Sequence, residues 1–374
     1  MEIDFIPVLQ YTHYFDVSVL CLILIAFWQC ASGNILKQNV AEFNAGWGFV
    51  LAVLIIFYMG LRPVSGVFGD TVNYARTFSA MEQIPMKWVW GGEWLFNNLL
   101  HLFARTSNIH MFFLFCATLY VLPLWIAMRR MFGSYSYIPF LILLGMFTFW
   151  NYGVNGIRNG IGASLIILAM TYVENIPIMT FLCILATGFH SSVFLMIGAG
   201  ILAWFIKNSY YYLAVWVVCV IVSYYVGSTI QSFLAGLGIG GEDERFTTYL
   251  TIDAEEFARY ELTVLRTGWR WDFIAYSLMG VGIGWFFIFY RKFQDEYYHW
   301  VYNIYLITNA FWVLVIRAAF SNRFAQISWF IMPIVLIYPF MKKRFWLNHE
   351  KMLGYAILVF YAFAFYSNIL RSLI

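Results

Sequence analysis

The chain has 374 residues, of which 62 % are hydrophobic and only 11 % are charged. A soluble domain contains about 45–50 % apolar and about 25 % charged residues, so a soluble protein of this composition could not bury its apolar side chains. The composition excludes a cytosolic enzyme, a secreted domain and a disordered chain. A net charge of +3 without a long basic run excludes a nucleic-acid binder. The sequence therefore predicts an integral membrane protein.

Twelve apolar runs are predicted to cross the bilayer as helices, because a span needs about 20 mainly apolar residues. In chain order these runs are 15–32, 45–61, 109–128, 136–153, 156–173, 177–189, 191–206, 210–228, 272–290, 299–317, 324–341 and 352–370. The run 94–104 is too short to span and is expected to re-enter or to lie in the interface. Runs 177–189 and 191–206 are separated only by His190 and form either a hairpin or one bent helix. The predicted fold is an all-α, polytopic membrane protein with about 12 transmembrane helices, a single transmembrane domain over 1–374.

Basic residues gather at one set of helix ends, which predicts the orientation, since cytoplasmic loops carry an excess of Lys and Arg. The loops assigned to the cytoplasm carry Lys37, Arg129–Arg130, Lys207, Arg291–Lys292 and Lys342–Arg344. The parts assigned to the cytoplasm hold ten basic and five acidic residues, whereas the outer parts hold twelve basic and fourteen acidic residues. In this orientation both termini lie outside. This pattern requires the hairpin form of 177–206. Two long loops then face outward, 62–108 and 229–271, and both are too aromatic for disordered segments.

The most informative segment is 150–164, at the outer end of a predicted span. Asn151, Asn155 and Asn159 repeat every four residues and are expected to share a helix face, with Arg158 beside it. A Gly-x-x-x-Gly pair in the same segment would let a neighbouring helix approach closely. An arginine at an outward helix N-terminus is suited to anions, because free N–H groups and the helix dipole add to its charge. The alternative is an arginine that only snorkels from a helix end.

Further residues on the predicted outer side are candidates for the same site. His190 marks the turn between the two short runs, either as a structural residue or as a base at the outer mouth. Arg317 and Arg323 lie six residues apart between two spans and could clamp one diphosphate, whereas each alone would be a helix-end anchor. The outer carboxylates nearest to span ends are candidate general bases: Asp70, Glu93 and Asp272. No His, Cys, Asp or Glu spacing predicts a metal site.

Arginines alternate with tryptophans near the end of the second long loop. Arg266 and Arg270 are four residues apart, with Trp269 and Trp271 interleaved. Arginine next to an aromatic ring suits stacking against a sugar and contact with a lipid phosphate equally well.

These elements together resemble the EpsG family, Wzy-like polysaccharide polymerases of bacterial exopolysaccharide and capsule clusters. In chain order the similar elements are Gly69-Asp70-x-x-x-Tyr74, Gly92-Glu93-x-Leu95-Phe96, the Arg158-Asn159-x-x-x-Ala163 helix start, the Phe189-His190-x-Ser192 turn and Arg323. The sequence departs from the family pattern at Asn159, where Gln is common, and at Phe324, where Tyr usually follows nearby. The resemblance runs from about residue 65 to 340, most of the chain.

The resemblance implies a glycan polymerase in the bacterial inner (cytoplasmic) membrane, with an outward-facing site and no cofactor. Its substrates would be oligosaccharide repeat units on undecaprenyl diphosphate, and its partners membrane lipids and other polysaccharide-export proteins. The growing glycan would move from its lipid diphosphate to a hydroxyl of the next unit, with an arginine-bound leaving group. In this interpretation Arg158, Arg317 and Arg323 hold the diphosphate and His190 or Asp70 is the base. The glycan contacts would be Asn155, Asn159, Arg266, Trp269 and Arg270.

Two other functions are compatible with the composition. A transporter or flippase of lipid-linked oligosaccharide would share the cationic cavity but needs access from both leaflets. The charged helix-end residues gather on one predicted side, which favours an enzyme. A structural subunit of a secretion assembly would leave Arg158 and its asparagine neighbours without a purpose.

Overall fold

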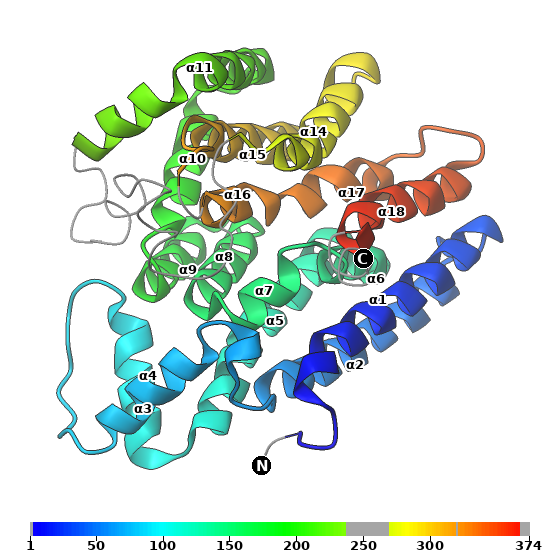
Figure 1. Cartoon of the computed structure of the whole chain (residues 1–374). Coiled ribbons are helices and arrows are strands. Elements are labelled where there is room, and N and C mark those ends of the chain that lie inside the picture. The colour runs from blue at the N-terminus through cyan, green and yellow to red at the C-terminus, as the bar shows by residue number, and fades with distance from the viewer. Residues whose placement is uncertain (1–2, 237–268, 319–320, 367–374) are drawn as a thin grey trace. The chain divides into compact units, whose positions relative to one another are not determined.

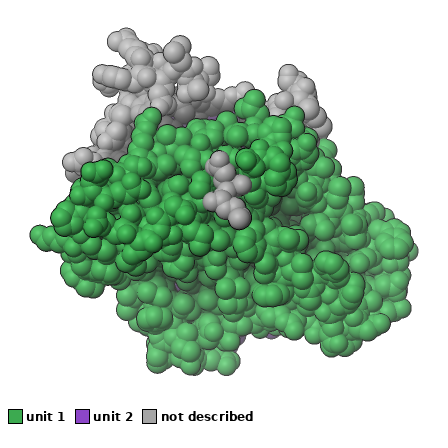
Figure 2. Space-filling model, turned by 90° about the horizontal axis from the view of Figure 1, so that it is seen from below, with its two compact units in different colours: residues 1–194, 340–374 green, residues 195–339 purple. Residues whose placement is uncertain are grey.

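A computed structural model describes residues 3–236, 269–318 and 321–366 (Figure 1). Helices are the only regular secondary structure within these ranges, as expected for the all-α class. The chain divides into two compact units: unit 1 comprises Met1–Phe194 and Phe340–Ile374, and unit 2 comprises Leu195–Pro339. Figure 2 shows unit 1 in green.

Unit 1 contains most of the N-terminal helices and the last one. Its helices are α1 (Val8–Ala31), α2 (Gln38–Gly60), α3 (Thr71–Met81), α4 (Trp94–Thr106), α5 (Ile109–Phe132), α6 (Tyr137–Leu144), α7 (Phe149–Val154), α8 (Ile157–Met170), α9 (Ile176–Phe189) and α18 (His349–Phe365), with 3₁₀ turns η1 (Gly66–Phe68) and η2 (Gly133–Ser136). Unit 2 contains most of α10 (Val193–Phe205) and α17 (Met332–Lys342), together with α11 (Ser209–Gly236), α14 (Trp271–Trp285) and its π-helical extension η3 (Phe286–Tyr290), α15 (Glu296–Leu314) and α16 (Asn322–Trp329).

Several described helices have the length and apolarity of membrane spans. Six are long enough to cross a bilayer: Val8–Ala31, Gln38–Gly60, Ile109–Leu144, Ser209–Gly227, Trp271–Tyr290 and Asn322–Lys342, and α8, α9 and α10 are shorter apolar helices. Large apolar side chains are exposed along these helices, for example Trp28 at 70 % and Tyr225 at 78 %. Because lipid is the only solvent in which such surfaces are stable, the prediction of a polytopic membrane protein is confirmed.

All twelve predicted apolar runs contain helix, but two of them are broken. Run 136–153 becomes α6 and α7, and α6 ends at Leu144, directly before Gly145, a residue of low helix propensity. Run 324–341 becomes α16 and α17, and Pro333 occupies the first turn of α17, where a proline ring is tolerated. Segment 177–206 forms two helices, α9 and α10, separated by His190–Ser192, so a single continuous helix is excluded.

The helices of unit 1 bring the first long loop onto the transmembrane helices. Helix α2 packs against α5, α5 against α8 and α8 against α9, while α1 packs against α18. The first long loop folds into η1, α3 and α4; α3 packs on α4, and α4 also contacts α5 and α9. The short run 94–104 is therefore a helix that lies against two longer helices, next to the ends of α8 and α9.

Unit 2 has a polar centre that joins four of its helices. Asn309 on α15 accepts a hydrogen bond from Trp216 on α11 at 2.7 Å and donates to Ser277 on α14 and Ser328 on α16, at 3.0 and 2.9 Å. Trp329 also donates to Ser277, at 2.8 Å. A buried amide bonded at both ends stabilises one relative arrangement of these helices, because any other would leave polar atoms unpaired.

Candidate functional site

Three residues that are distant in the sequence meet in unit 1. Arg158 Nη1 donates a hydrogen bond to Glu93 Oε2, and His190 Nε2 lies 3.2 Å from Glu93 Oε1. Arg158 is the second residue of α8, Glu93 immediately precedes α4, and His190 immediately follows α9. Their side chains are 17–21 % exposed, so a ligand can reach them. We call these three residues the Arg158–Glu93–His190 cluster.

The imidazole of His190 has a defined orientation. Its Nδ1 accepts a hydrogen bond from the backbone N–H of Ser192 at 3.0 Å, so the neutral ring carries its proton on Nε2, which faces Glu93. The His190 backbone is extended, and the Ser192 hydroxyl donates to Asn159 Oδ1 at 2.7 Å. Asn159 on α8 therefore holds the turn that carries His190.

Two aromatic rings lie beside the guanidinium of Arg158. Its central carbon is 5.8 Å from the Tyr74 ring centroid and 5.7 Å from that of Phe96, and the two rings meet edge to face. Burial raises the pKa of Tyr74, against the opposing effect of the Arg158 charge, so the phenol stays protonated at neutral pH. Tyr74 is thus a hydrogen-bond donor and a ring surface at this site, and cannot serve as a base near neutral pH.

The first long loop is tied to the chain segment just before α8. Asn155 Oδ1 accepts a hydrogen bond from the backbone N–H of Asp70 at 2.9 Å, and its Nδ2 donates to Asn151 Oδ1 at 3.1 Å. The Asp70 carboxylate accepts from Asn73 at 3.1 Å. Gly69 has a φ of +65° and lies against the Asn155 amide, where a Cβ atom would overlap it. Asn155 therefore positions the loop, and glycine is required at position 69.

A buried arginine that the sequence analysis did not single out locks the same junction. Arg62 is fully buried, and its guanidinium donates to the carbonyl of Met59 at 2.6 Å, the hydroxyl of Thr71 at 3.2 Å and the carbonyl of Val154 at 3.1 Å. Met59 and Val154 lie in the last turns of α2 and α7, where helix dipoles favour a cation. Burial lowers the pKa of Arg62 to about 10, so it remains charged at neutral pH. From sequence alone, an arginine directly after a span is indistinguishable from an ordinary helix-end anchor.

The helix break between α7 and α8 corrects one expectation. Asn151 and Asn155 belong to α7 and its end, whereas Asn159 belongs to α8, so the expected single face of three asparagines is wrong. Gly160 permits the break, because a Cβ atom there would lie 2.5 Å from the Tyr152 carbonyl oxygen. The small-residue pattern thus allows a close approach, as predicted, and the neighbour is α7 itself.

Two predicted residues of unit 2 come together in an aromatic surrounding. Arg317 donates to the carbonyl of Tyr224 at 3.0 Å, and its guanidinium carbon is 6.0 Å from the Trp269 ring. Trp269 also contacts Tyr224 and Trp271, with centroids 5.2 and 5.5 Å apart. The arginine and the tryptophan expected to contact substrate are therefore neighbours.

The remaining predicted residues of unit 2 have different surroundings. Arg270 forms two hydrogen bonds to the Asp272 carboxylate, at 2.9 and 2.6 Å, and lies over Phe273. Arg270, predicted to contact the glycan, and Asp272, a candidate general base, are therefore paired with each other. Arg323 is the second residue of α16, and Arg266 lies outside the described residues.

Three tryptophans precede and follow Glu93 in the first long loop. Trp88, Trp90 and Trp94 pack with ring centroids 5.1–6.3 Å apart, and Trp90 is 74 % exposed. The buried Asn98 holds this segment by bonding both the N–H and the carbonyl of Val89, at 3.0 and 2.7 Å. These rings are not among the residues predicted from sequence, although the alternation of tryptophans in Lys87-Trp-Val-Trp-Gly-Gly-Glu-Trp94 indicates an aromatic surface.

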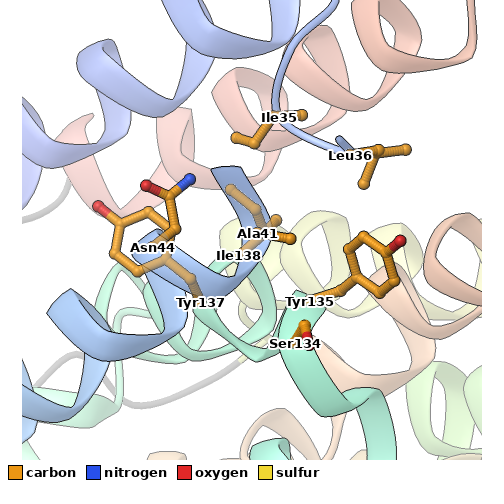
Figure 3. Close-up of a pocket in the computed structure, with 8 residues that line it drawn as sticks. All are labelled: Ile35, Leu36, Ala41, Asn44, Ser134, Tyr135, Tyr137 and Ile138. Atoms are coloured by element: carbon orange, nitrogen blue, oxygen red, sulfur yellow. The ribbon is translucent and has the colours of Figure 1, made fainter. Parts of the chain in front are cut away.

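Unit 1 also contains a small pocket, and none of its lining residues belongs to the Arg158–Glu93–His190 cluster. Ile35, Leu36, Asn44, Ser134 and Tyr135 are among those that line it, as Figure 3 shows. These residues belong to or adjoin two loops predicted to be cytoplasmic, and none of the pocket's lining residues is charged. Among the described residues no three His, Cys, Asp or Glu side chains are grouped to hold a metal ion. The Arg158–Glu93–His190 cluster is therefore the strongest candidate site in the described part of the chain.

Fold and site define a multi-pass helical membrane protein that holds a partly exposed arginine, carboxylate and imidazole at helix ends. The EpsG family model matches residues 47–373, nearly the whole chain, and the chain belongs to the EpsG family. This is a Wzy-like polysaccharide polymerase family, so the resemblance is confirmed and a general role in polysaccharide polymerisation is supported. The match includes all three residues of the cluster. Comparisons with curated proteins and with solved structures gave no match.

Proposed function

We propose that this protein joins oligosaccharide repeat units, carried on undecaprenyl diphosphate, into exopolysaccharide or capsule at the outer face of the bacterial inner membrane. Membership of the EpsG family supports the polymerase role. The Arg158–Glu93–His190 cluster carries the proposal, because it combines a cation for a diphosphate with groups that can take part in proton transfer. The reaction is metal-independent, since the diphosphate is already an activated leaving group.

In the proposed reaction a hydroxyl of the acceptor unit attacks the anomeric carbon of the donor glycan. The bond from that carbon to the diphosphate oxygen breaks, and its electron pair leaves with undecaprenyl diphosphate. Arg158 at the start of α8 stabilises the charge that develops on the leaving group, helped by the free N–H groups of the helix. Arg317 and Arg323 are proposed as further diphosphate ligands.

The acceptor hydroxyl must lose its proton during the transfer. His190 and Asp70 are the residues proposed from sequence for this step, and of the two His190 contacts Glu93, the partner of Arg158. Asn155, Asn159, Arg266, Trp269 and Arg270 are proposed to contact the glycan. To these we add the exposed ring of Trp90, since aromatic faces bind pyranose rings and Glu93 lies three residues away.

The test is a reconstituted polymerisation assay. Purified protein in liposomes receives synthetic lipid-linked repeat units, and products are separated by size. Wild type should give a ladder, and Arg158→Ala should abolish it, while Arg76→Ala, which removes an exposed arginine of α3 in the first long loop, should leave it unchanged. Arg158→Lys should restore little, because an ammonium group binds phosphate only as a point charge.

Two results would contradict the proposal. A normal ladder from Arg158→Ala would make that residue a simple helix-end anchor. Movement of fluorescent lipid-linked oligosaccharide between leaflets, without any lengthening by wild type, would indicate a transporter instead.

A further inference from the structure

In the Arg158–Glu93–His190 cluster, the carboxylate of Glu93 occupies the position on Arg158 where an anionic substrate would bind. Glu93 uses one carboxylate oxygen for Arg158 and the other for His190, so both groups that face the site bind a carboxylate of the same chain. We propose that Glu93 is the proton acceptor of the transfer reaction, and that the donor diphosphate frees it by replacing it on Arg158. This inference rests on the proposed function.

The hydrogen bonds of His190 assign it a different role from that of the base. Its Nδ1 lone pair is taken by the Ser192 N–H, and its Nε2–H points to Glu93. The neutral ring therefore offers no lone pair to an acceptor hydroxyl, and it acts as a donor that orients the carboxylate. An ionised carboxylate has about four lone-pair positions, so Glu93 can take a proton while it accepts the His190 N–H, and it is the better proton acceptor.

Charge favours the exchange of partners on Arg158. A diphosphate that links a lipid to a sugar carries two negative charges, whereas Glu93 carries one, and guanidinium binds phosphate oxygens in the same bidentate geometry as a carboxylate. The Tyr74 and Phe96 rings beside Arg158 would remain in place when the partner changes. The incoming anion therefore meets a preformed cationic position.

The backbone around Glu93 permits its side chain to turn while the loop stays attached. Gly91 and Gly92 have φ angles of +127° and +53°, and directly precede Glu93. Asn98 holds the loop on both sides, through the Val89 backbone and through the Trp94 carbonyl at 2.7 Å. Rotation of one partly exposed side chain is then sufficient to transfer Arg158 from carboxylate to diphosphate.

In the resulting step, the acceptor oxygen forms the new bond to the anomeric carbon as its proton passes to Glu93. The anomeric carbon–oxygen bond breaks, and the electron pair goes to the Arg158-bound diphosphate. His190 keeps its Nε2–H on Glu93 throughout. After the lipid diphosphate leaves, Glu93 loses the proton to water and binds Arg158 again.

The experiment measures binding and turnover on the same preparations. The full chain is placed in nanodiscs of neutral lipid, and binding of inorganic pyrophosphate is followed by calorimetry. Glu93→Gln should bind about tenfold tighter than wild type, because the competing charge is gone, and should polymerise at least 100-fold more slowly. Glu82→Gln, which removes an exposed carboxylate from the same loop, should change neither quantity.

Two further variants keep the test decisive. Glu93→Asp retains the charge but cannot reach both partners, so it should also bind pyrophosphate more tightly and turn over slowly. His190→Gln retains an N–H donor for Glu93 and should keep more polymerisation than His190→Ala.

The outcomes separate the two proposals. Unchanged or weaker pyrophosphate binding by both Glu93 variants overturns the exchange on Arg158, and substantial polymerisation by Glu93→Gln overturns its role as proton acceptor. Either result leaves Arg158 in the polymerase proposal. If pyrophosphate still binds to Arg158→Ala, the anion does not bind at Arg158, and the proposed function of the cluster is overturned.

Discussion

A single methyl group at Gly69 should disrupt the junction between the first long loop and the start of α8. Gly69 has φ +65° and ψ −122°, a backbone conformation that L-amino acids rarely adopt but achiral glycine adopts readily. A Cβ atom there would overlap the Asn155 amide, which accepts a hydrogen bond from the Asp70 N–H at 2.9 Å. Gly69→Ala therefore forces either the backbone or the Asn155 side chain to move.

The magnitude follows from two contributions. A non-glycine residue in a sparsely populated backbone region costs about 1–3 kcal/mol. Loss of the hydrogen bond between Asn155 and Asp70 costs about 0.5–1.5 kcal/mol more. Together they amount to about 1.5–4.5 kcal/mol, which lowers the population of the attached loop, relative to the detached one, by roughly 10- to 2000-fold.

The matched control is Gly66→Ala in the same turn. Gly66 has no left-handed φ, and a Cβ atom there meets nothing within 4 Å. In the liposome assay Gly69→Ala should lose most of its polymer, and limited proteolysis should cut the loop 62–108 faster, while Gly66→Ala behaves as wild type. If the two variants polymerise and resist protease equally, the junction does not position the site.

Three further predictions test the buried arginine, the aromatic loop and the orientation. Arg62→Lys should lower the melting temperature in detergent by several degrees and reduce polymerisation, because an ammonium cannot reach all three oxygens that the guanidinium contacts; an unchanged melting curve would refute this reasoning. Trp90→Ala should raise the KM for repeat units several-fold with little change in kcat, and a change in kcat alone would contradict a binding role. A cysteine placed at Glu82 should react with an impermeant thiol reagent in intact spheroplasts, and one at Lys343 only after lysis; the opposite labelling would reverse the predicted topology.

The apolar helices and several of their ends were predictable from the sequence, because both depend on residues that are neighbours in the chain. Each apolar run in the sequence corresponds to helix, since a segment without charges must satisfy its backbone internally in lipid. Arg158 at the start of α8 and His190 directly after α9 were likewise readable, because glycines and polar residues interrupt the apolar pattern at those points. These features depend on local sequence alone.

Which side chains meet was decided by the tertiary structure. Asp70, Glu93 and Asp272 looked equivalent in the sequence, yet only Glu93 lies between Arg158 and His190, while Asp272 pairs with Arg270. The choice depends on α4 packing against α9, a contact between helices about 80 residues apart in the sequence. The burial of Arg62 depends in the same way on the end of α7. Such contacts are determined by how helices pack after insertion, and no periodicity within one segment encodes them.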